Sequence, residues 1–258
     1  MNLVYFSSPK GGVGKSTLVA NLAFALQRLG HQVVVVDFDS QNAQRLHLGL
    51  PMSEQRGLVA QLQSTDDWRN LILETPSGIG LLPYGNANRA QREHFNAQLQ
   101  QRPDCIALGL GPLLSQPGCI VLADLPTGPG EALYTLREME AIPVVVMEAD
   151  STSAATLGQV SSDNFLADAK ALYIVNQVYI RSRLNRDSTE LFEKKLGAAL
   201  LGTVHRDEAV REAIASQKSI FEYAPASAVV QDLEAIARNI SRMLPEAYGH
   251  SAMKLSFN

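Results

Sequence analysis

Eight consecutive residues near the start of the chain combine the side chains and the backbone freedom needed to bind a phosphate. They are Lys10, Gly11, Gly12, Val13, Gly14, Lys15, Ser16 and Thr17. The three glycines allow the backbone to curl so that successive N–H groups point inward at an anion. We expect Lys15 to contact the β- and γ-phosphates of a nucleotide and the Ser16 hydroxyl to bind Mg²⁺. The stretch therefore predicts a phosphate-binding loop.

The flanking residues predict the two elements that would position this loop. The apolar run 3–6 predicts a short buried strand, and residues 16–29 predict a helix that ends at Gly30. The N-terminus of such a helix adds about half a positive charge at the phosphate. The alternative is a glycine-rich turn that binds nothing, and the two lysines of the stretch argue against it.

The loop departs from the common pattern G-x-x-x-x-G-K-[ST], because Pro9 stands where the first glycine belongs. Its K-G-G-x-G-K-[ST] form resembles the deviant phosphate loop of the ParA/MinD family of P-loop ATPases. This resemblance extends over nearly the whole chain and implies a slow ATPase that binds ATP and Mg²⁺. It also implies that Lys10 reaches across a homodimer interface to the partner's nucleotide, and that hydrolysis releases the two subunits.

Two aspartates, Asp37 and Asp39, follow a run of β-branched residues that is typical of a strand covered on both faces. Ligands bind at this end of the strands in parallel sheets. The resemblance implies that Asp37 supports the metal shell, while Asp39 joins Lys10 and Lys15 in the catalytic set and positions the attacking water. A carboxylate that orients water and accepts its proton typically contributes about 10²–10⁴-fold to the rate.

The family usually reads D-x-D-P-Q-G at this first switch. Here Ser40 and Asn42 take the places of the proline and the glycine. Asp37 and Asp39 are retained. The changes at Ser40 and Asn42 therefore affect the backbone geometry of the loop and not its acidic groups.

A second strand, 119–123, ends at Asp124, which begins the sequence D-L-P-T-G. An acid in this position supports the Mg²⁺ shell in P-loop enzymes. The sequence resembles the second switch of the ParA/MinD family, in which the amide of the glycine, here Gly128, senses the γ-phosphate. The alternative is an aspartate that caps the next helix.

Asn176 closes the strand predicted at 171–175, in the position of the adenine-reading asparagine of the family. Its amide offers an acceptor and two donors, which suits the edge of adenine. A turn-forming asparagine is the alternative. His205 follows the last predicted strand, 201–204, where the family often closes over the base, and we interpret it as an ordinary polar loop residue.

Strand and helix patterns alternate along the whole chain, without a repeat or a low-complexity linker. We therefore predict an α/β fold with a single doubly wound, mostly parallel sheet and helices on both faces, in one P-loop ATPase domain over 1–258 with a flexible tail at 245–258. Further strands are predicted at 32–36, 80–83 and 143–147, and helices at 86–101, 188–196 and 229–244.

Composition and charge narrow the class of protein. The chain of 258 residues has a net charge of −4, which does not favour a general nucleic-acid binder. Cys105 and Cys119 are too far apart to form a C-x-x-C pair, so we interpret them as buried thiols of a cytosolic protein. A strand at the very start leaves no room for a signal peptide, and no apolar run approaches the length of about 20 residues that a membrane span needs. We expect a soluble, cytoplasmic protein.

Several shorter stretches resemble the BcsQ branch of the family, which serves bacterial cellulose biosynthesis. They are 42–46, 67–69, 81–85, 204–209 and 222–223. This resemblance implies an accessory ATPase of a membrane cellulose-synthase complex, with the small protein BcsR and the cytoplasmic components of the synthase as partners. It also implies recruitment to the inner membrane or a cell pole through those partners. The alternative is a ParA-type ATPase of chromosome or plasmid partition that binds DNA non-specifically.

Overall fold

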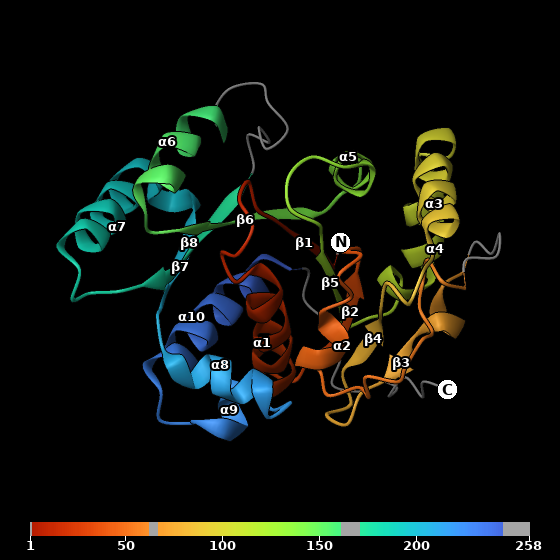
Figure 1. The fold of residues 1–258 in the computed structure, drawn as a ribbon, viewed down its shortest axis with the longest axis horizontal. Coiled ribbons are helices and arrows are strands. Elements are labelled where there is room, and N and C mark those ends of the chain that lie inside the picture. The colour runs from red at the N-terminus through yellow and green to blue at the C-terminus, as the bar shows by residue number, and fades with distance from the viewer. Residues whose placement is uncertain (1, 62–66, 161–170, 245–258) are drawn as a thin grey trace.

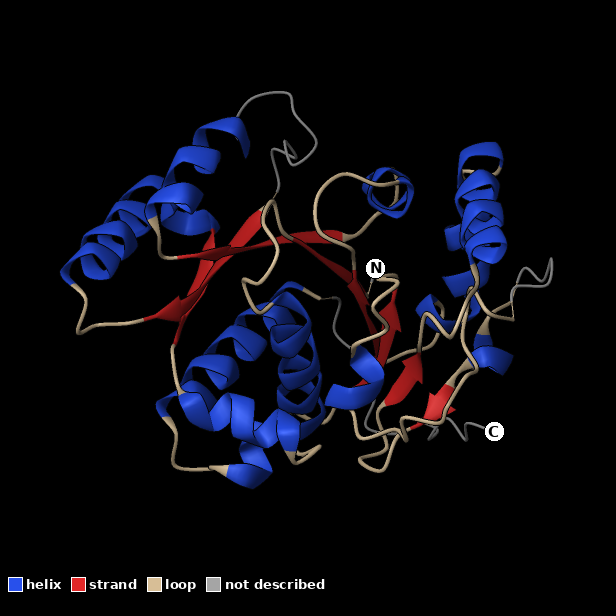
Figure 2. Ribbon diagram, viewed as in Figure 1, coloured by secondary structure: helices blue, strands red, loops and turns tan. Residues whose placement is uncertain are grey.

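A computed structural model describes residues 2–61, 67–160 and 171–244, whose strands form one eight-stranded sheet in the order β3-β4-β2-β5-β1-β6-β7-β8. All neighbouring strands are parallel except β3 and β4, which pair antiparallel at one edge (Figures 1 and 2). The strands are β1 (Leu3–Ser7), β2 (Gln32–Asp37), β3 (Leu73–Glu74), β4 (Gly80–Leu82), β5 (Cys119–Asp124), β6 (Ile142–Glu148), β7 (Leu172–Val178) and β8 (Leu200–His205). The predicted α/β class with a mostly parallel sheet is confirmed.

Helices cover both faces of the sheet (Figure 1). One face carries α1 (Lys15–Arg28), α2 (Gln44–His47), α8 (Glu208–Ala215), α9 (Ile220–Tyr223) and α10 (Ala228–Met243). The other face carries α3 (Arg89–Gln101), α4 (Cys105–Leu114), α5 (Glu131–Arg137), α6 (Ser151–Val160) and α7 (Arg183–Leu196). Two short 3₁₀ helices complete this part of the chain, η1 (Arg69–Leu71) and η2 (Gly197–Ala199).

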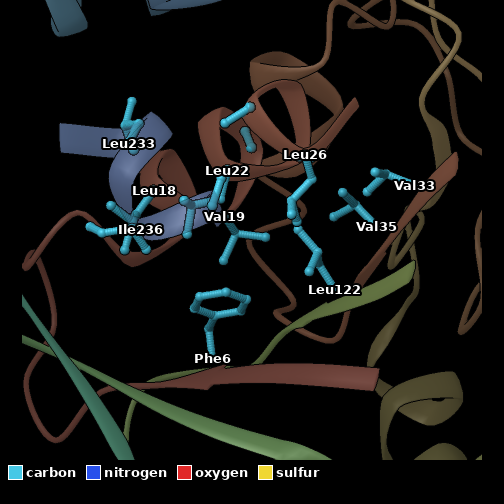
Figure 3. Close-up of a cluster of buried hydrophobic side chains, with 14 of the residues drawn as sticks. Phe6, Leu18, Val19, Leu22, Leu26, Val33, Val35, Leu122, Leu233 and Ile236 are labelled. Carbon is cyan, nitrogen blue, oxygen red and sulfur yellow. The ribbon is translucent and has the colours of Figure 1, made fainter. Parts of the chain in front are cut away.

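The strands bury both of their faces, which explains their continuous apolar sequences. In β1, Val4 and Phe6 belong to the core beneath α1, whereas Leu3 and Tyr5 belong to the core on the opposite face. Figure 3 shows the Phe6 ring facing Val19 of α1. Because alternate side chains of a strand point to opposite faces, a strand covered on both sides needs apolar residues at every position.

The boundaries of several elements differ from the predictions for local reasons. The helix predicted at 188–196 begins at Arg183, because the Ser182 side chain accepts a hydrogen bond from the N–H of Asn185 and caps it. The helix predicted at 86–101 begins at Arg89, after an Asn88 cap. This helix is largely polar, but its residues Phe95 and Leu99 are buried in the core.

The two cysteines differ in burial. Cys119 is buried, and burial raises the pKa of its thiol to about 12. Cys105 is only partly buried, because it lies at the first turn of α4, so the expectation of two buried thiols was wrong for this residue.

The tail predicted at 245–258 lies outside the described residues. Within the described ranges, the helices are too short or too polar to cross a membrane.

Candidate nucleotide site

The glycine-rich loop joins the carboxyl end of the central strand β1 to the first turn of α1. Gly12 and Gly14 have φ angles of +81° and +82°, a left-handed conformation that glycine adopts without steric cost. A Cβ atom at Gly14 would also lie only 2.5 Å from the Nδ2 atom of Asn176. No side chain caps α1, and its first turn carries no acid, so its N-terminal N–H groups are left for an anion.

Lys15 forms an ion pair in the interior, at the base of the loop. Its Nζ atom lies 2.5 Å from Oδ1 of Asp124, and the two side chains are 6% and 0% exposed. Asp124 ends β5, which lies between β1 and β2 in the sheet. The sheet order therefore brings this acid from the second switch next to the lysine of the phosphate loop.

Asp37 is fully buried at the end of β2 and organises the first switch. Its carboxylate accepts hydrogen bonds from the N–H groups of Asp39, at 2.9 Å, and Gln44, at 3.1 Å. Burial and the nearby charge of Asp124 raise the pKa of Asp37 well above its usual range, although the two N–H donors oppose the shift. The charged form of the Asp37 carboxyl is therefore destabilised unless a cation is bound beside it.

Gln44 connects the three parts of the site, and the sequence reasoning assigned it no role. Its Nε2 atom donates to the Ser16 carbonyl at 2.9 Å and to Oδ2 of Asp124 at 2.7 Å. The side chain is completely buried, and its Oε1 atom has no hydrogen-bond partner among the described residues. A signal did exist, because Gln44 lies within the stretch 42–46 that resembles the BcsQ branch.

The loop of the first switch is held by a left-handed residue and local hydrogen bonds. Asn42 has a φ angle of +52°, in the left-handed region where asparagine is among the best substitutes for glycine. The N–H of Gln41 donates to the Asp39 carboxylate at 3.0 Å, and the N–H of Asn42 donates to the Asp39 carbonyl at 2.8 Å. Asp39 is partly exposed.

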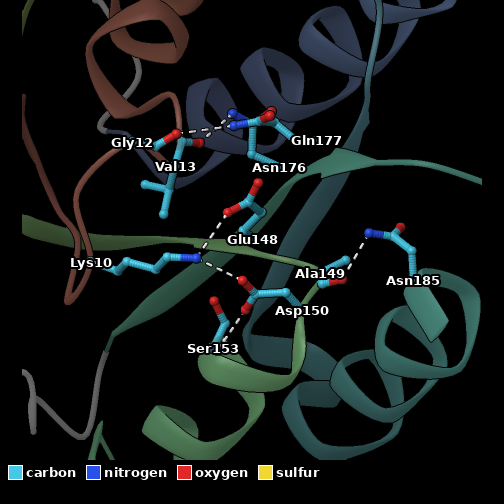
Figure 4. A network of polar contacts seen from close by, with 10 residues as sticks. All are labelled: Lys10, Gly12, Val13, Glu148, Ala149, Asp150, Ser153, Asn176, Gln177 and Asn185. Atoms are coloured by element: carbon cyan, nitrogen blue, oxygen red, sulfur yellow. Dashed lines mark hydrogen bonds and ion pairs between the residues drawn. The ribbon is translucent and has the colours of Figure 1, made fainter.

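Lys10 is held by two acids of its own chain at the end of β6 (Figure 4). Its Nζ atom lies 2.7 Å from Oδ2 of Asp150 and 3.3 Å from Oε2 of Glu148. The hydrogen bond to Asp150 is the main reason that the pKa of Lys10 is raised. Burial works to raise the pKa of Asp150, but hydrogen bonds from Lys10 and Ser153 outweigh it and lower this pKa. Neither acid was predicted from the sequence, although Glu148 directly follows the strand predicted at 143–147 and Asp150 lies three residues after it.

Gly128 in the second switch has a φ angle of +80°, and its N–H donates to the Ser8 carbonyl at 3.0 Å. The amide expected to sense a γ-phosphate is therefore bonded to Ser8, two residues before the phosphate loop. It must leave Ser8 before it can contact a ligand.

A pocket of about 230 Å³ opens beside the loop, toward α8 and α10. Asn176 and Gln177 line it next to the phosphate loop, where their side chains donate to the carbonyls of Val13, at 2.8 Å, and Gly12, at 3.2 Å (Figure 4). Aliphatic side chains share the rest of the lining with polar and charged ones. The complete lining is Gly12, Gly14, Thr17, Leu18, Asn21, Asn176, Gln177, Val204, His205, Arg206, Asp207, Glu208, Val210, Arg211, Ile214, Val229 and Leu233.

The donor set fits Mg²⁺ held together with a nucleotide. Ser16, Asp37 and Asp124 offer a hydroxyl and two carboxylates, and oxygen donors are the ligands that Mg²⁺ prefers. Within the described ranges, His, Cys, Asp and Glu side chains do not form a group of three that could hold a metal by themselves. Mg²⁺ is usually bound by one or two carboxylates plus substrate phosphates, so this incomplete set suits it.

The fold and this loop define a P-loop protein of the MinD/ParA type. The septum site-determining protein MinD of Pyrococcus horikoshii, solved with Mg-ADP, superposes with a TM-score of 0.72 over 94% of this chain and 96% of its own, at 22% identity. A plasmid partition protein of Borrelia burgdorferi bound to AMPPNP has a TM-score of 0.74, at 18% identity over 94% of this chain and 99% of its own.

The chain belongs to the family of the cellulose biosynthesis protein BcsQ, whose profile matches residues 1–240. The BcsQ protein of Salmonella typhimurium is 27% identical over 237 residues, which are 92% of this chain and 93% of that protein. BcsQ of Escherichia coli K12 is 28% identical over 229 residues, which are 88% of this chain and 89% of that protein. The predicted resemblance is thus confirmed at the level of the family.

Proposed function

We propose that this chain is an ATPase switch that dimerises around ATP and serves a bacterial cellulose-synthase complex as an accessory factor. The observation that carries the proposal is the meeting of Lys15 and Gln44 on one buried carboxylate, that of Asp124. Lys15 belongs to the phosphate loop, Gln44 follows the first switch, and Asp124 begins the second switch, so the three residues join these parts of the site. A phosphate that draws Lys15 away from Asp124 changes the hydrogen bonding of both switches at once, as a nucleotide-dependent switch requires.

In this proposal the backbone N–H groups of residues 11–17 bind the phosphates, and Lys15 contacts the β- and γ-phosphates. Ser16, Asp37 and Asp124 hold Mg²⁺, which when bound neutralises charge on the phosphates. The partly exposed Asp39 orients the attacking water and accepts its proton. The Gly128 amide exchanges the Ser8 carbonyl for the γ-phosphate, so that the second switch responds to the state of the nucleotide.

Dimerisation assigns a second role to Lys10. Its side chain is 38% exposed, and the two acids that pair with it are themselves partly exposed. Such surface pairs are worth about 1 kcal/mol or less. A partner's nucleotide phosphates can therefore displace these acids, and we propose that Lys10 then spans the dimer interface.

Membership of the BcsQ family supports the cellular role. We propose a cytoplasmic protein that is recruited to the inner membrane or a cell pole through BcsR and the cytoplasmic components of a cellulose synthase. Its work would be assembly or placement of that complex, driven by the ATP cycle.

The test uses the Asp39→Ala variant, which should bind ATP and Mg²⁺, hydrolyse ATP poorly and stay dimeric. Its retention is measured on membranes that carry a cellulose-synthase complex, on membranes that lack the complex, and on non-specific duplex DNA. The control is Lys15→Ala, which should not bind ATP. Retention only on the first membranes supports the proposal. Retention on DNA that falls with added salt would indicate a partition ATPase instead.

A further inference from the structure

We propose that Gln44 is a positioning residue for the Mg²⁺ of this site, and that its side chain sets the affinity for the metal and the preference for Mg²⁺ over Ca²⁺. The inference rests on the proposed function, because it assumes that Ser16, Asp37 and Asp124 hold Mg²⁺ beside a nucleotide. It extends that function to a residue outside the metal-supporting set.

Gln44 forms a hydrogen bond with each member of that set. Its backbone N–H donates to Oδ2 of Asp37 at 3.1 Å. Its Nε2 atom donates to the carbonyl of Ser16 at 2.9 Å and to Oδ2 of Asp124 at 2.7 Å. Ser16 lies in α1, and the two aspartates end β2 and β5. A single residue therefore ties together the elements that supply the donors of the metal.

The partners of the Gln44 side chain fix the direction of its amide. A backbone carbonyl and an ionised carboxylate both accept, so the NH₂ group faces Ser16 and Asp124 and uses both of its hydrogens. A reversed amide would place Oε1 against two acceptors, which is unfavourable in the interior. The side chain is 0% exposed, so bulk water does not compete for these bonds. The amide therefore holds one orientation.

The bond to Asp124 matters most after Lys15 has moved. In the structure Lys15 donates to Oδ1 of Asp124, whereas Gln44 donates to Oδ2. In the proposed function the phosphates draw Lys15 away from this carboxylate. Gln44 then still holds Oδ2, so that Oδ1 is released in a fixed direction to support the metal shell. Without the Gln44 amide, the carboxylate would lose both of these partners.

A donor set that is held in this way favours the smaller ion. Mg²⁺ demands near-ideal octahedral geometry at about 2.0–2.1 Å, whereas Ca²⁺ accepts oxygen ligands at about 2.3–2.6 Å in flexible arrangements. Removal of a group that orients metal ligands typically costs about 10–100-fold in affinity. Because Mg²⁺ tolerates displaced donors less well, the loss of the Gln44 amide should weaken Mg²⁺ binding more than Ca²⁺ binding.

The test measures by titration calorimetry the affinity for ADP in EDTA, in Mg²⁺ and in Ca²⁺, without reference to hydrolysis. ADP is the probe because the proposed function assigns dimerisation to ATP, so the monomer is measured. The factor by which each metal tightens ADP binding reports, by linkage, the affinity of the ADP-bound protein for that metal. We expect the wild type to show a larger factor with Mg²⁺ than with Ca²⁺.

Gln44→Met is the main variant, because methionine is unbranched and of similar length, lacks the amide, and keeps the backbone N–H that Asp37 accepts. In EDTA its affinity for ADP should stay within about twofold of the wild type, since the phosphate loop is unchanged. Its Mg²⁺ factor should fall about tenfold or more. Its Ca²⁺ factor should fall about threefold or less, because Ca²⁺ tolerates displaced ligands.

Two further variants separate positioning from general loosening. Gln44→Asn keeps the amide but draws it back by one methylene, so that it no longer reaches both partners, and it should act in the same direction even if Gln44→Met does not fold. The matched control is Gln27→Met. The Nε2 atom of Gln27 also donates to a backbone carbonyl, that of Ser77 at 2.8 Å, but this residue lies near the far end of α1. The control should keep both wild-type factors.

An unchanged Mg²⁺ factor in the Gln44 variants would overturn the inference. Equal losses of ADP affinity with and without metal would also overturn it, because Gln44 would then only support the fold. Equal falls of the Mg²⁺ and Ca²⁺ factors would show that its amide does not position the donors. A wild type that does not bind ADP, or binds it without any response to Mg²⁺, would refute the proposed function and this inference with it. Mg²⁺-dependent binding that survives the loss of the amide would refute the inference alone.

Discussion

The Nζ atom of Lys10 lies 2.7 Å from Oδ2 of Asp150, so the lysine that we propose acts in a partner's site is paired within its own chain. The same carboxyl group accepts the N–H of Ser153 through Oδ1 at 2.7 Å and thereby caps the start of α6. Dimerisation through Lys10 must therefore compete with this intramolecular pair.

This competition predicts opposite effects for two substitutions. Asp150→Asn keeps an oxygen for the Ser153 N–H but removes the negative charge, so it should strengthen ATP-driven dimerisation about two- to fivefold, as expected for a partly exposed pair. Lys10→Ala should weaken dimerisation more than it weakens ATP binding by the monomer. Sedimentation equilibrium with ATP and Mg²⁺ measures both. Weaker dimerisation in Asp150→Asn would mean that the acid takes part in the interface instead of competing with it.

The buried pair of Lys15 and Asp124 predicts a stability effect that a double variant can reverse. Lys15→Ala leaves the Asp124 carboxylate buried without its cation, which should lower the free energy of unfolding by about 3 kcal/mol. Adding Asp124→Asn removes the stranded charge and should restore most of that loss. Urea unfolding without nucleotide measures both variants, and ATP binding should be absent from both. Equal unfolding midpoints for the single and double variants would contradict this account.

The role proposed for Asp39 predicts that ATP binding and ATP hydrolysis can be separated. Asp39→Ala removes the proposed base but leaves the phosphate loop unchanged, so ATP affinity should stay close to that of the wild type while single-turnover hydrolysis falls about 10²-fold or more. Asp39→Asn is the matched control, because it keeps the side-chain oxygen that accepts the Gln41 N–H. Wild-type hydrolysis in both variants would show that Asp39 does not position the water.

The raised pKa of Asp37 predicts proton release when Mg²⁺ and ATP bind. Its folded-state pKa lies above the unfolded value, chiefly through burial and then through the charge of Asp124. The stability it contributes is therefore fully present below the unfolded pKa and is lost as pH rises through the folded pKa. A bound cation favours the charged carboxylate, so binding should expel a proton and weaken as pH falls through the raised pKa.

Calorimetry in two buffers of different ionisation enthalpy measures this proton. The apparent binding enthalpy of the wild type should depend on the buffer, and that of Asp37→Asn should depend on it much less. Buffer-independent enthalpies for the wild type would show that Asp37 is already charged in the free protein.

Most of the fold and the phosphate loop could be predicted from the sequence, because their signals are local. The run of valines at 33–36 reports a strand that is covered on both faces, and the loop residues 10–17 are contiguous. The antiparallel strand β3 was not predicted, because it is only two residues long and has no periodicity that sequence reasoning can detect.

The sequence by itself determined which chemical groups stand at the carboxyl ends of the strands, since β2, β5, β6 and β7 each place an acid or an amide on that side of the parallel sheet. Only the tertiary structure decided which of these groups meet. Gln44 and Asp124 are 80 residues apart, and Lys10 and Asp150 are 140 residues apart. The physical reason is the strand order, because β5 inserts between β1 and β2 and β6 joins the other side of β1. Which strands become neighbours depends on how the sheet and the helices pack in the whole domain. No local pattern of residues predicts this order.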